Sequence, residues 1–272
     1  MSRRMRLSGR TALVTGAAGG IGRAISSSLA RRGCNLALAD VDEANLAATA
    51  AQLAATGVRI TTYRLDVSDE AAINGLPDVI ARDHGGLDIL INNAGVAVAG
   101  TFQEVSPADF DWLMSINFWG VVRMTRAFLP LLHASDEARI VNLSSIFGII
   151  TPPGQTAYCA SKFAVRGFSE SLRHELADSN VGVTVVHPGG VATSIARSAR
   201  LPAGSNQEIT AEQTARFEAF LRLPPEKAGE IIVGAVERRR PRILVGSDAR
   251  RMAIIERLMP VSYWKIIGRN VE

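Results

Sequence analysis

The chain has 272 residues, of which 47% are hydrophobic and 21% are charged, a balance typical of a folded soluble protein and not of a disordered one. The net charge of +4 is modest, and the arginine clusters are scattered without aromatic residues between them, so no nucleic-acid partner is expected. The two cysteines, Cys34 and Cys159, form neither a disulfide framework nor a metal-binding pattern, so we expect a reducing compartment and no metal site.

The N-terminal residues are basic but lack the apolar stretch of a signal peptide, and no run of about 18 apolar residues occurs, so a cytoplasmic protein without a membrane span is expected. Beyond them, β-branched or leucine-rich runs alternate with longer segments of helical periodicity. Strands are predicted at Thr11–Thr15, Asn35–Ala39, Arg59–Arg64, Asp88–Ile91, Arg139–Leu143, Val183–His187 and Arg242–Val245. The helices between them include Ile21–Arg32, Glu43–Thr56, Pro107–His133, Thr156–Ser179 and Pro225–Arg238.

Such alternation requires crossover connections, so it predicts an α/β fold of the Rossmann type: a doubly wound, seven-stranded parallel sheet with helices on both faces. No linker rich in proline, glycine or serine divides the chain, and residues 1–272 are expected to form a single domain. Two stretches do not follow the alternation. They are the polar stretch 195–222, which includes a helix-like segment, and the C-terminal extension 246–272.

The first strand leads directly into the sequence Thr-Gly-Ala-Ala-Gly-Gly-Ile-Gly, which ends at Ile21 and Gly22 and opens a helix. Gly16 permits a tight turn, Gly20 lets the backbone approach a pyrophosphate, and Gly22 lets the helix pack closely on the strand. The helix N-terminus adds free N–H groups and a partial positive charge. A plain strand–helix turn can carry the same glycines, but these flanks favour a dinucleotide site.

An acid closes the second predicted strand, as the dinucleotide pattern requires. Asp40 can accept hydrogen bonds from the ribose hydroxyls of the adenosine and would repel a 2′-phosphate. No basic residue occupies positions 17–19, and Val41 follows, so NAD is favoured over NADP as the cofactor. The alternative for Asp40 is a solvated residue that caps the next helix.

Tyr158 and Lys162 are four residues apart on a predicted helix and therefore share a face. Hydride transfer to a carbonyl needs a proton donor, and the reverse reaction needs a base. A free tyrosine has a pKa near 10, and a neighbouring cation is expected to lower it. Alone, such a pair is common on solvated helices.

Together, these motifs resemble the short-chain dehydrogenase/reductase family in its single-domain, NAD-dependent form. The resemblance covers about residues 8 to 194 and includes, in order, the glycine turn, Asn92-Asn93-Ala94-Gly95, Asn117, Ser144-Ser145, Tyr158, Lys162 and Pro188-Gly189. It implies catalytic roles for Asn117, Ser145, Tyr158 and Lys162. Tyr158 would transfer the proton, and Ser145, rather than Ser144, would hold the substrate oxygen. Lys162 would hold the nicotinamide ribose and lower the pKa of Tyr158.

The resemblance also implies the remaining cofactor contacts. Asn117 would hold a water of the proton relay. The alternative, a residue that kinks its helix by bonding its own backbone, is compatible with that role. The residues implied to contact the cofactor are Gly16, Gly20, Ile21, Gly22, Asp40, Asp66, Val67, Asn93, Ala94, Gly95, Tyr158, Lys162, Pro188, Gly189, Val191 and Thr193. Each of the loop residues has an alternative as a turn or packing residue. Cys159 is interpreted as packing, and neither His133 nor His187 is given a role.

The function expected is that of an NAD-dependent oxidoreductase that interconverts an alcohol and a carbonyl. The alternatives are an NADPH-dependent ketoreductase and a catalytically silent NAD-binding regulator. Apolar residues between Ser145 and Tyr158, namely Ile146, Phe147, Ile149, Ile150, Pro152 and Pro153, would line the pocket and favour a lipophilic substrate such as a steroid, retinoid or fatty acyl chain. The resemblance makes 195–222 the substrate-loop region.

A homodimer or homotetramer is expected, built on the long helices 107–133 and 156–179. Those helices carry more apolar residues than one core-facing stripe needs: Phe110, Trp112, Phe118, Trp119, Phe163 and Phe168. The C-terminal residues 250–269 combine apolar side chains, a Tyr-Trp pair and flanking Arg and Lys, the composition of an interfacial segment. Packing on its own domain or a neighbouring subunit is the favoured interpretation, and contact with a membrane surface is the alternative.

Overall fold

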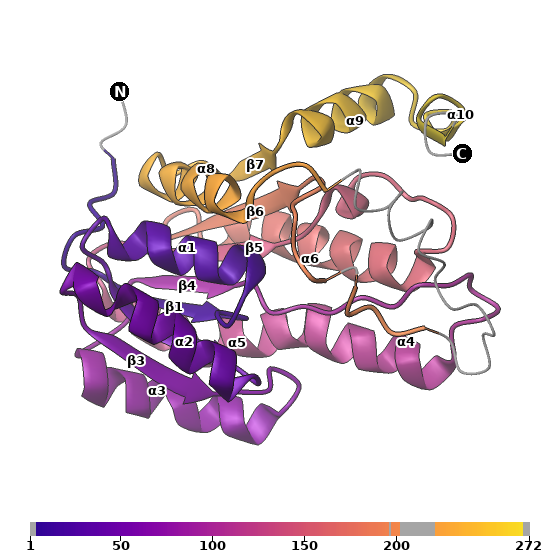
Figure 1. Cartoon of the computed structure of the whole chain (residues 1–272). Helices are drawn as coiled ribbons and strands as arrows, with labels where there is room; N and C mark the ends of the chain where they lie inside the picture. Colours follow the sequence, from indigo (N-terminus) through magenta and orange to yellow (C-terminus); the bar gives the residue numbers. More distant parts are fainter. Residues whose placement is uncertain (1–3, 196, 202–220, 269–272) are drawn as a thin grey trace.

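The computed structural model describes residues 4–195, 197–201 and 221–268. Within these residues the framework is one parallel sheet with the strand order β3-β2-β1-β4-β5-β6-β7 (Figure 1). The strands are β1 (Thr11–Thr15), β2 (Asn35–Asp40), β3 (Ile60–Arg64), β4 (Ile89–Asn92), β5 (Ala138–Leu143), β6 (Val181–Pro188) and β7 (Arg242–Val245). All seven predicted strands are present and paired in parallel, which confirms the doubly wound α/β fold.

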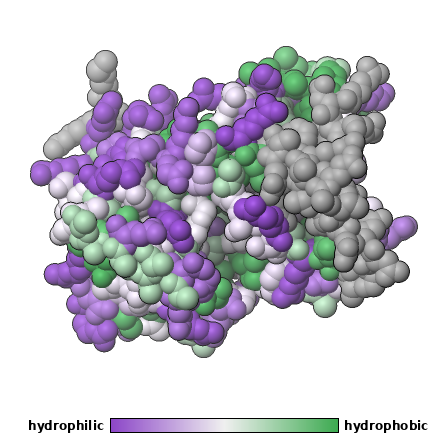
Figure 2. Space-filling model, in the orientation of Figure 1, coloured by the Kyte–Doolittle hydropathy of each residue, from purple (hydrophilic) through white to green (hydrophobic). Residues whose placement is uncertain are grey.

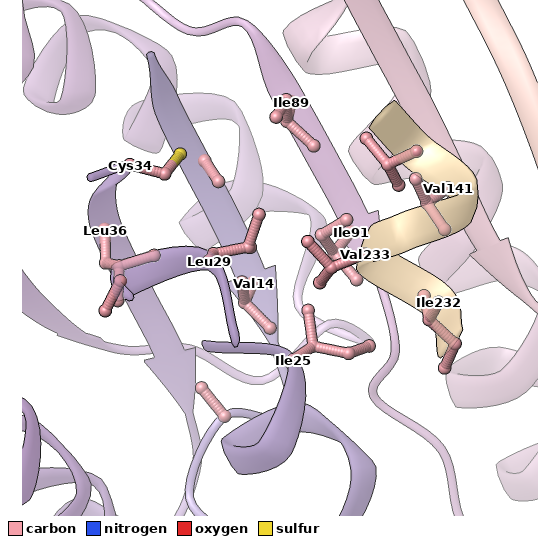
Figure 3. Close-up of a cluster of buried hydrophobic side chains, with 14 of the residues drawn as sticks. Val14, Ile25, Leu29, Cys34, Leu36, Ile89, Ile91, Val141, Ile232 and Val233 are labelled. Atoms are coloured by element: carbon pink, nitrogen blue, oxygen red, sulfur yellow. The ribbon is translucent and has the colours of Figure 1, made fainter. Parts of the chain in front are cut away.

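Helices cover both faces of this sheet (Figure 1). They are α1 (Gly20–Ala30), α2 (Glu43–Leu53), α3 (Glu70–His84), α4 (Pro107–Met114), α5 (Gly120–Ala134), α6 (Thr156–Glu175), α8 (Pro225–Glu237), α9 (Ser247–Leu258) and α10 (Trp264–Ile267), with the short segments η1 (Ala54–Thr56), η2 (Ser115–Trp119) and η3 (Ile146–Gly148). Between the sheet and α1, α2 and α8, Ile25 and Val233 pack with Val14 (Figure 3). On the other face, Phe128 of α5 packs with Leu13. Adjacent strand residues thus point into two cores, which explains the nearly continuous apolar runs.

β6 begins two residues earlier than the predicted strand at Val183–His187. Gly182 interrupts the β-branched pattern, and a glycine within such a run favours a strand boundary. In the structure Gly182 pairs with Arg139 of β5, and a side chain at Gly182 would collide with the Arg139 guanidinium. A residue without a side chain is needed here because the buried Arg139 side chain lies over this position. Gly182 is therefore part of the strand and does not mark its boundary.

The helix predicted at Pro107–His133 is not one regular α-helix. α4 passes into α5 through η2, a π-helical segment with Asn117 at its centre. Such one-turn π segments inside α-helices are frequent at functional sites. The helix-like segment expected within 195–222 lies for the most part outside the described residues.

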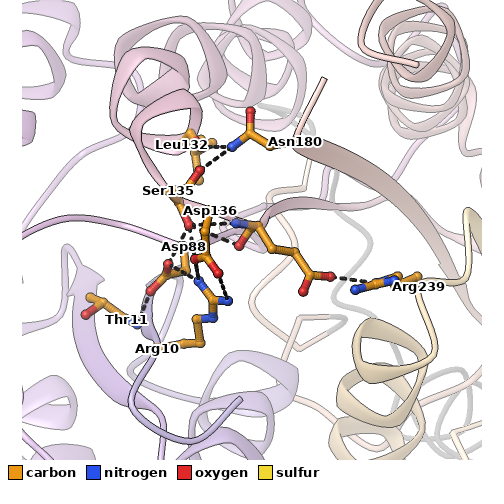
Figure 4. Close-up of polar contacts among 9 residues, drawn as sticks. Arg10, Thr11, Asp88, Leu132, Ser135, Asp136, Asn180 and Arg239 are labelled. Carbon is orange, nitrogen blue, oxygen red and sulfur yellow. Dashed lines mark hydrogen bonds and ion pairs between the residues drawn. The ribbon is translucent and has the colours of Figure 1, made fainter. Parts of the chain in front are cut away.

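Polar contacts join the amino ends of the central strands (Figure 4). Arg10 donates to Asp88 at 2.9 Å and pairs with Asp136, while Asp88 also accepts from the backbone N–H of Thr11 at 2.8 Å. A hollow of about 1120 Å³, lined in part by Arg10, Asp88 and Arg139, lies at this end. Doubly wound folds bind their ligands at the opposite, carboxyl edge, where the motif residues lie.

The chain after β7 packs across the segment that follows β5. The Tyr263 and Thr151 hydroxyls are 2.5 Å apart, and the Thr151 backbone N–H donates to Tyr263 at 2.9 Å. Apolar side chains of the two segments form one cluster, made of Ile146, Ile149, Ile150, Ala249 and Ile267 with Phe147, Leu244, Met252, Ala253, Ile255, Tyr263 and Trp264 against them. The tail therefore packs on its own chain, as the favoured interpretation predicts.

Candidate active site

Every motif loop lies at the carboxyl edge of the sheet, because each follows the end of a parallel strand. The glycine turn follows β1, Asp40 ends β2, and Asp66 follows β3. Asn93 follows β4 and Ser145 follows β5, while Pro188 ends β6. The topology therefore brings residues far apart in the sequence to the place where doubly wound folds bind ligands.

The glycine turn has the backbone geometry that a phosphate cradle needs. Gly16 and Gly20 have φ values of +66° and +52°, a region that favours glycine. A Cβ at Gly16 would lie 2.8 Å from the Asn93 side chain, and one at Gly22 would collide with the Gly16 carbonyl oxygen. Gly19, at the start of α1, provides no side-chain cap. The first N–H groups of α1 thus fit a bound pyrophosphate.

The loop after β4 is tied to the glycine turn by hydrogen bonds. The Asn93 side chain donates to the carbonyl oxygens of Thr15 and Gly16 at 2.9 and 3.1 Å. The Thr15 hydroxyl accepts from the backbone N–H groups of Asn93 and Ala94. These contacts place the expected cofactor residue Ala94 beside the turn and show that Asn93 has a structural role. Gly95 lies beside the Asn117 and Lys162 side chains.

Two acids close the neighbouring strands. Asp40 accepts from the Ala18 backbone N–H at 2.9 Å, so its carboxylate lies against the glycine turn. Asp66 accepts from the backbone and hydroxyl of Ser68 at 2.8 and 2.7 Å, and the next residue, Val67, is buried beneath Gly120. Asp66 and Val67 thus have a turn and a packing role, respectively.

Arg23 is a cation near Asp40 that the sequence interpretation missed. It lies one turn into α1, and its guanidinium reaches back to donate to the Ala18 carbonyl oxygen and, at 3.0 Å, to the Thr49 hydroxyl. Arg23 lies outside positions 17–19 and 41, where the sequence pattern places a cation for a 2′-phosphate. The signal that was available is that a long side chain on a helix leans toward the N-terminus of the helix, over the preceding turn.

Ser145, Tyr158 and Lys162 come together between the end of β5 and α6. Lys162 is buried, and its Nζ lies 5.5 Å from the centroid of the Tyr158 ring and donates to the Leu143 carbonyl oxygen at 3.1 Å. Ser144 is buried and donates to the Lys162 carbonyl oxygen at 2.8 Å. Ser145, partly exposed, is therefore the serine available beside Tyr158, as expected.

Burial controls the titration of this cluster. It raises the pKa of Tyr158 to about 12, and a hydrogen bond with the Ser145 side chain acts in the opposite direction. Burial lowers the pKa of Lys162 to about 8. The expected lowering of the Tyr158 pKa by Lys162 is not found in this arrangement, where burial raises the pKa and only the hydrogen bond with Ser145 lowers it. The phenol is protonated at neutral pH.

Asn117 is fully buried in the π segment, and its side chain holds the chain after Gly95. It accepts from the Val96 N–H at 2.8 Å and donates to the Val96 carbonyl oxygen at 2.9 Å and to Ser161 at 3.2 Å. The helix is irregular here, as the π segment shows. Contrary to the alternative considered above, however, the side chain bonds a neighbouring loop and not its own backbone.

The segment after β6 lies against the glycine turn. A Cβ at Gly20 would lie 3.2 Å from the Thr193 methyl carbon, so Thr193 adjoins the turn. Val191 is buried and pairs with Leu223. The Asp248 carboxylate accepts from the Gly190 N–H at 2.7 Å and fills the space beside Gly189. Asp248, on α9, is a supporting residue that the sequence interpretation missed.

His187 is a third residue that received no role from the sequence. It is fully buried on β6, and its Nδ1 lies 2.9 Å from the Ser145 carbonyl oxygen. Burial lowers its pKa to about 4, so it is neutral at pH 7 and Nδ1–H donates to Ser145. The sequence shows no acid that pairs with His187, because the partner of this histidine is a backbone carbonyl oxygen that only the fold brings close.

The apolar segment after Ser145 does not line a pocket as a whole, which corrects the expectation above. Ile146, Ile149 and Ile150 are buried against the C-terminal tail. Phe147 faces Tyr158 edge-on, with ring centroids 6.1 Å apart. Helices long and apolar enough to cross a membrane, and clusters of His, Cys, Asp or Glu suited to a metal ion, are both absent from the described residues.

A doubly wound sheet with a glycine turn between β1 and α1 defines the class of dinucleotide-binding α/β proteins. Within that class, residues 10–203 match the short chain dehydrogenase family. The SadH protein of Mycobacterium tuberculosis, named as an oxidoreductase, is 41% identical over 266 residues, which cover 97% of this chain and 95% of that protein. The chain belongs to the short-chain dehydrogenase/reductase family and is an oxidoreductase.

Solved structures of the family include complexes with either nicotinamide dinucleotide. A member from Burkholderia phymatum in complex with NAD is 32% identical with a TM-score of 0.85, covering 93% of this chain and 95% of that chain. A metagenomic short-chain oxidoreductase in complex with NADP is 28% identical with a TM-score of 0.72, covering 89% of this chain and 98% of that chain. The family thus uses both cofactors.

Proposed function

We propose that this protein is an NAD(H)-dependent oxidoreductase that interconverts an alcohol and a carbonyl, with Tyr158 as the acid and base. The observation that carries the proposal is the cluster of Ser145, Tyr158 and Lys162 at the carboxyl edge, beside the glycine turn. A silent NAD-binding protein would have no need for this cluster around a partly buried phenol.

The protonated phenol suits reduction of a carbonyl. Tyr158 donates its proton to the carbonyl oxygen as the carbon becomes an alcohol carbon, and Ser145 donates a hydrogen bond to that oxygen. In the reverse direction the phenolate removes the hydroxyl proton. Lys162 provides a positive charge next to the phenolate, which stabilises it.

NAD fits the residues at the carboxyl edge. The glycine turn would hold the pyrophosphate, Asp40 the adenosine ribose, and Lys162 the nicotinamide ribose. When bound, the nicotinamide supplies or accepts the hydride. Asp40 supports NAD because its charge would repel a 2′-phosphate.

A lipophilic substrate is supported by the surroundings of Tyr158. Its ring packs with an apolar cluster that includes Val96, Val98, Phe110 and Trp112, and Phe147 lies against it from the other segment. Few groups in this cluster could bond the hydroxyls of a sugar. We therefore favour a hydrophobic secondary alcohol or ketone.

An NADPH-dependent ketoreductase is the second candidate, and Arg23 is the observation that favours it. Its guanidinium lies by Ala18 and Thr49, close to the turn against which Asp40 packs. A cation there could pair with a 2′-phosphate.

The first prediction concerns Tyr158→Phe, assayed with NAD and a panel of hydrophobic secondary alcohols by the absorbance of the reduced nicotinamide. Because only the proton-transferring hydroxyl is lost, turnover should fall by about a thousandfold while NADH binding changes little. The matched control is Tyr63→Phe, which removes a phenol that bonds Asp83 on the far side of the fold. Residual activity above roughly a tenth of wild type would remove Tyr158 from this role.

A further inference from the structure

α9 and the turn after it have two faces that differ in their surroundings. The inner face, with Ala249, Met252 and Ile255, packs on the segment that follows Ser145. This contact already joins the tail to the body of the protein. Packing on the chain's own core therefore does not account for the apolar residues on the outer face.

The outer face is apolar where it meets solvent. Ile254, Leu258 and Val261 are exposed by 59%, 75% and 96%. Ile254 and Leu258 are four residues apart on α9 and share a face, and Val261 lies in the turn after the helix. Met259 and Ile266 are also exposed. In Figure 2 hydrophobic residues gather along the upper right edge of the molecule, where Figure 1 shows α9. Contiguous exposed apolar residues usually mark an interaction surface.

The same face is positively charged. Arg250, Arg251, Arg257 and Lys265 are exposed, and none of them forms an ion pair with another described residue. The acids of α9 have a different position: Asp248 bonds the Gly190 N–H, and Glu256 is partly buried. Cations surrounding an apolar strip complement a surface that is both anionic and hydrophobic.

We propose that this outer face docks on the surface of a bilayer that contains anionic lipids. Leu258, Val261 and Ile254 would enter the boundary between headgroups and acyl chains, while the arginines and Lys265 would pair with lipid phosphates. A second copy of the chain fits less well, because a twofold contact would bring the same unpaired cations together. Pro260 follows the end of α9, so the contact is short and peripheral. The proposal goes beyond the proposed function and does not depend on it.

The second prediction tests this docking by co-sedimentation of the full chain with vesicles. Vesicles of phosphatidylcholine plus phosphatidylglycerol should bind the protein at low salt, and vesicles of phosphatidylcholine alone should bind it at least tenfold less. Arg250→Glu with Arg257→Glu should weaken the binding by about fivefold or more for each residue, and Leu258→Ser with Val261→Ser by about tenfold.

The matched control is Arg64→Glu with Arg82→Glu, which makes the same change in net charge on exposed side chains far from α9. Circular dichroism and light scattering are measured on every variant to follow folding and oligomeric state. Absence of binding to anionic vesicles, or an equal loss in the control, would overturn the proposal. So would a Leu258/Val261 variant that sediments normally but has lost an oligomer, since the face would then contact a second copy.

Discussion

Tyr158 is partly buried and Lys162 and His187 are buried, and in each of the three the loss of contact with water shifts the pKa so that the neutral form is favoured. The sequence predicted the first two through their spacing on one helix face. It could not predict how deeply they are buried, because the buried environment comes from segments 96–98, 143–147 and 181–188 together. For the same reason His187 received no role before its partner, the Ser145 carbonyl oxygen, was placed.

The third prediction follows from His187. Its folded-state pKa of about 4 lies below the unfolded value of about 6.5, so between these values the unfolded chain binds more protons. The contribution of neutral, buried His187 to the free energy of unfolding is therefore complete above about pH 6.5. It decreases by about 3 kcal/mol as the pH falls toward 4. His187→Asn keeps a donor toward Ser145 but does not titrate. Urea unfolding measured across this range should show a smaller pH dependence for the variant.

The exposed His133 provides the control for this measurement. His133→Asn should leave the pH dependence of the unfolding free energy unchanged, because the side chain is exposed to solvent and its replacement changes no buried contact. If His187→Asn and wild type lose stability in parallel between pH 6.5 and 4, burial of His187 is not the source of the acid sensitivity.

At the level of elements, apolar periodicity was enough to predict every strand, because a sheet buried on both faces needs continuous apolar runs. Boundaries depended on contacts that the local sequence does not contain, as at Gly182, where Arg139 crosses β6. The π segment at Asn117 and the packing of Ile149 on the tail also require partners distant in sequence. Predictions based on local spacing therefore succeeded for the backbone conformation of the glycine turn and failed for the three isoleucines expected to line a pocket.

The fourth prediction concerns the choice of cofactor at the β2 end. Asp40→Asn removes the charge but keeps an acceptor for the Ala18 N–H. Fluorescence titration should show that wild type binds NADH more tightly than NADPH. In Asp40→Asn the preference should shrink by about tenfold, because the repulsion of the 2′-phosphate is lost.

Two other variants complete the experiment. Asp42→Asn changes an exposed acid that caps α2 and should leave the preference unchanged. Arg23→Ala should have little effect on NADH binding if NAD is the cofactor. Tighter binding of NADPH by wild type, lost in Arg23→Ala, would establish the NADPH-dependent alternative instead.

At the scale of the whole molecule, apolar residues remain on the surface after both cores are filled. The aromatic residues expected to form an oligomer interface divide into two groups. Phe110 and Trp112 pack within their own chain near Val98, and Phe118 and Phe168 lie partly buried with their rings in contact. Trp119 and Phe163 remain exposed by 49% and 37%. Composition predicted a surplus of apolar residues on these helices, but only the packing shows which residues form it.

The fifth prediction is that the protein forms a homodimer or homotetramer through the face that carries Trp119 and Phe163. Aromatic side chains dominate the binding energy of such interfaces, so replacing both with serine should raise the dissociation constant by at least about a hundredfold. Light scattering at micromolar concentration should show an oligomer for wild type and smaller species for the double variant. Phe102→Ser, which changes an aromatic residue exposed by 70% outside these helices, should leave the assembly intact. A wild-type monomer would exclude this interface, and the two aromatic residues would then be ordinary exposed side chains.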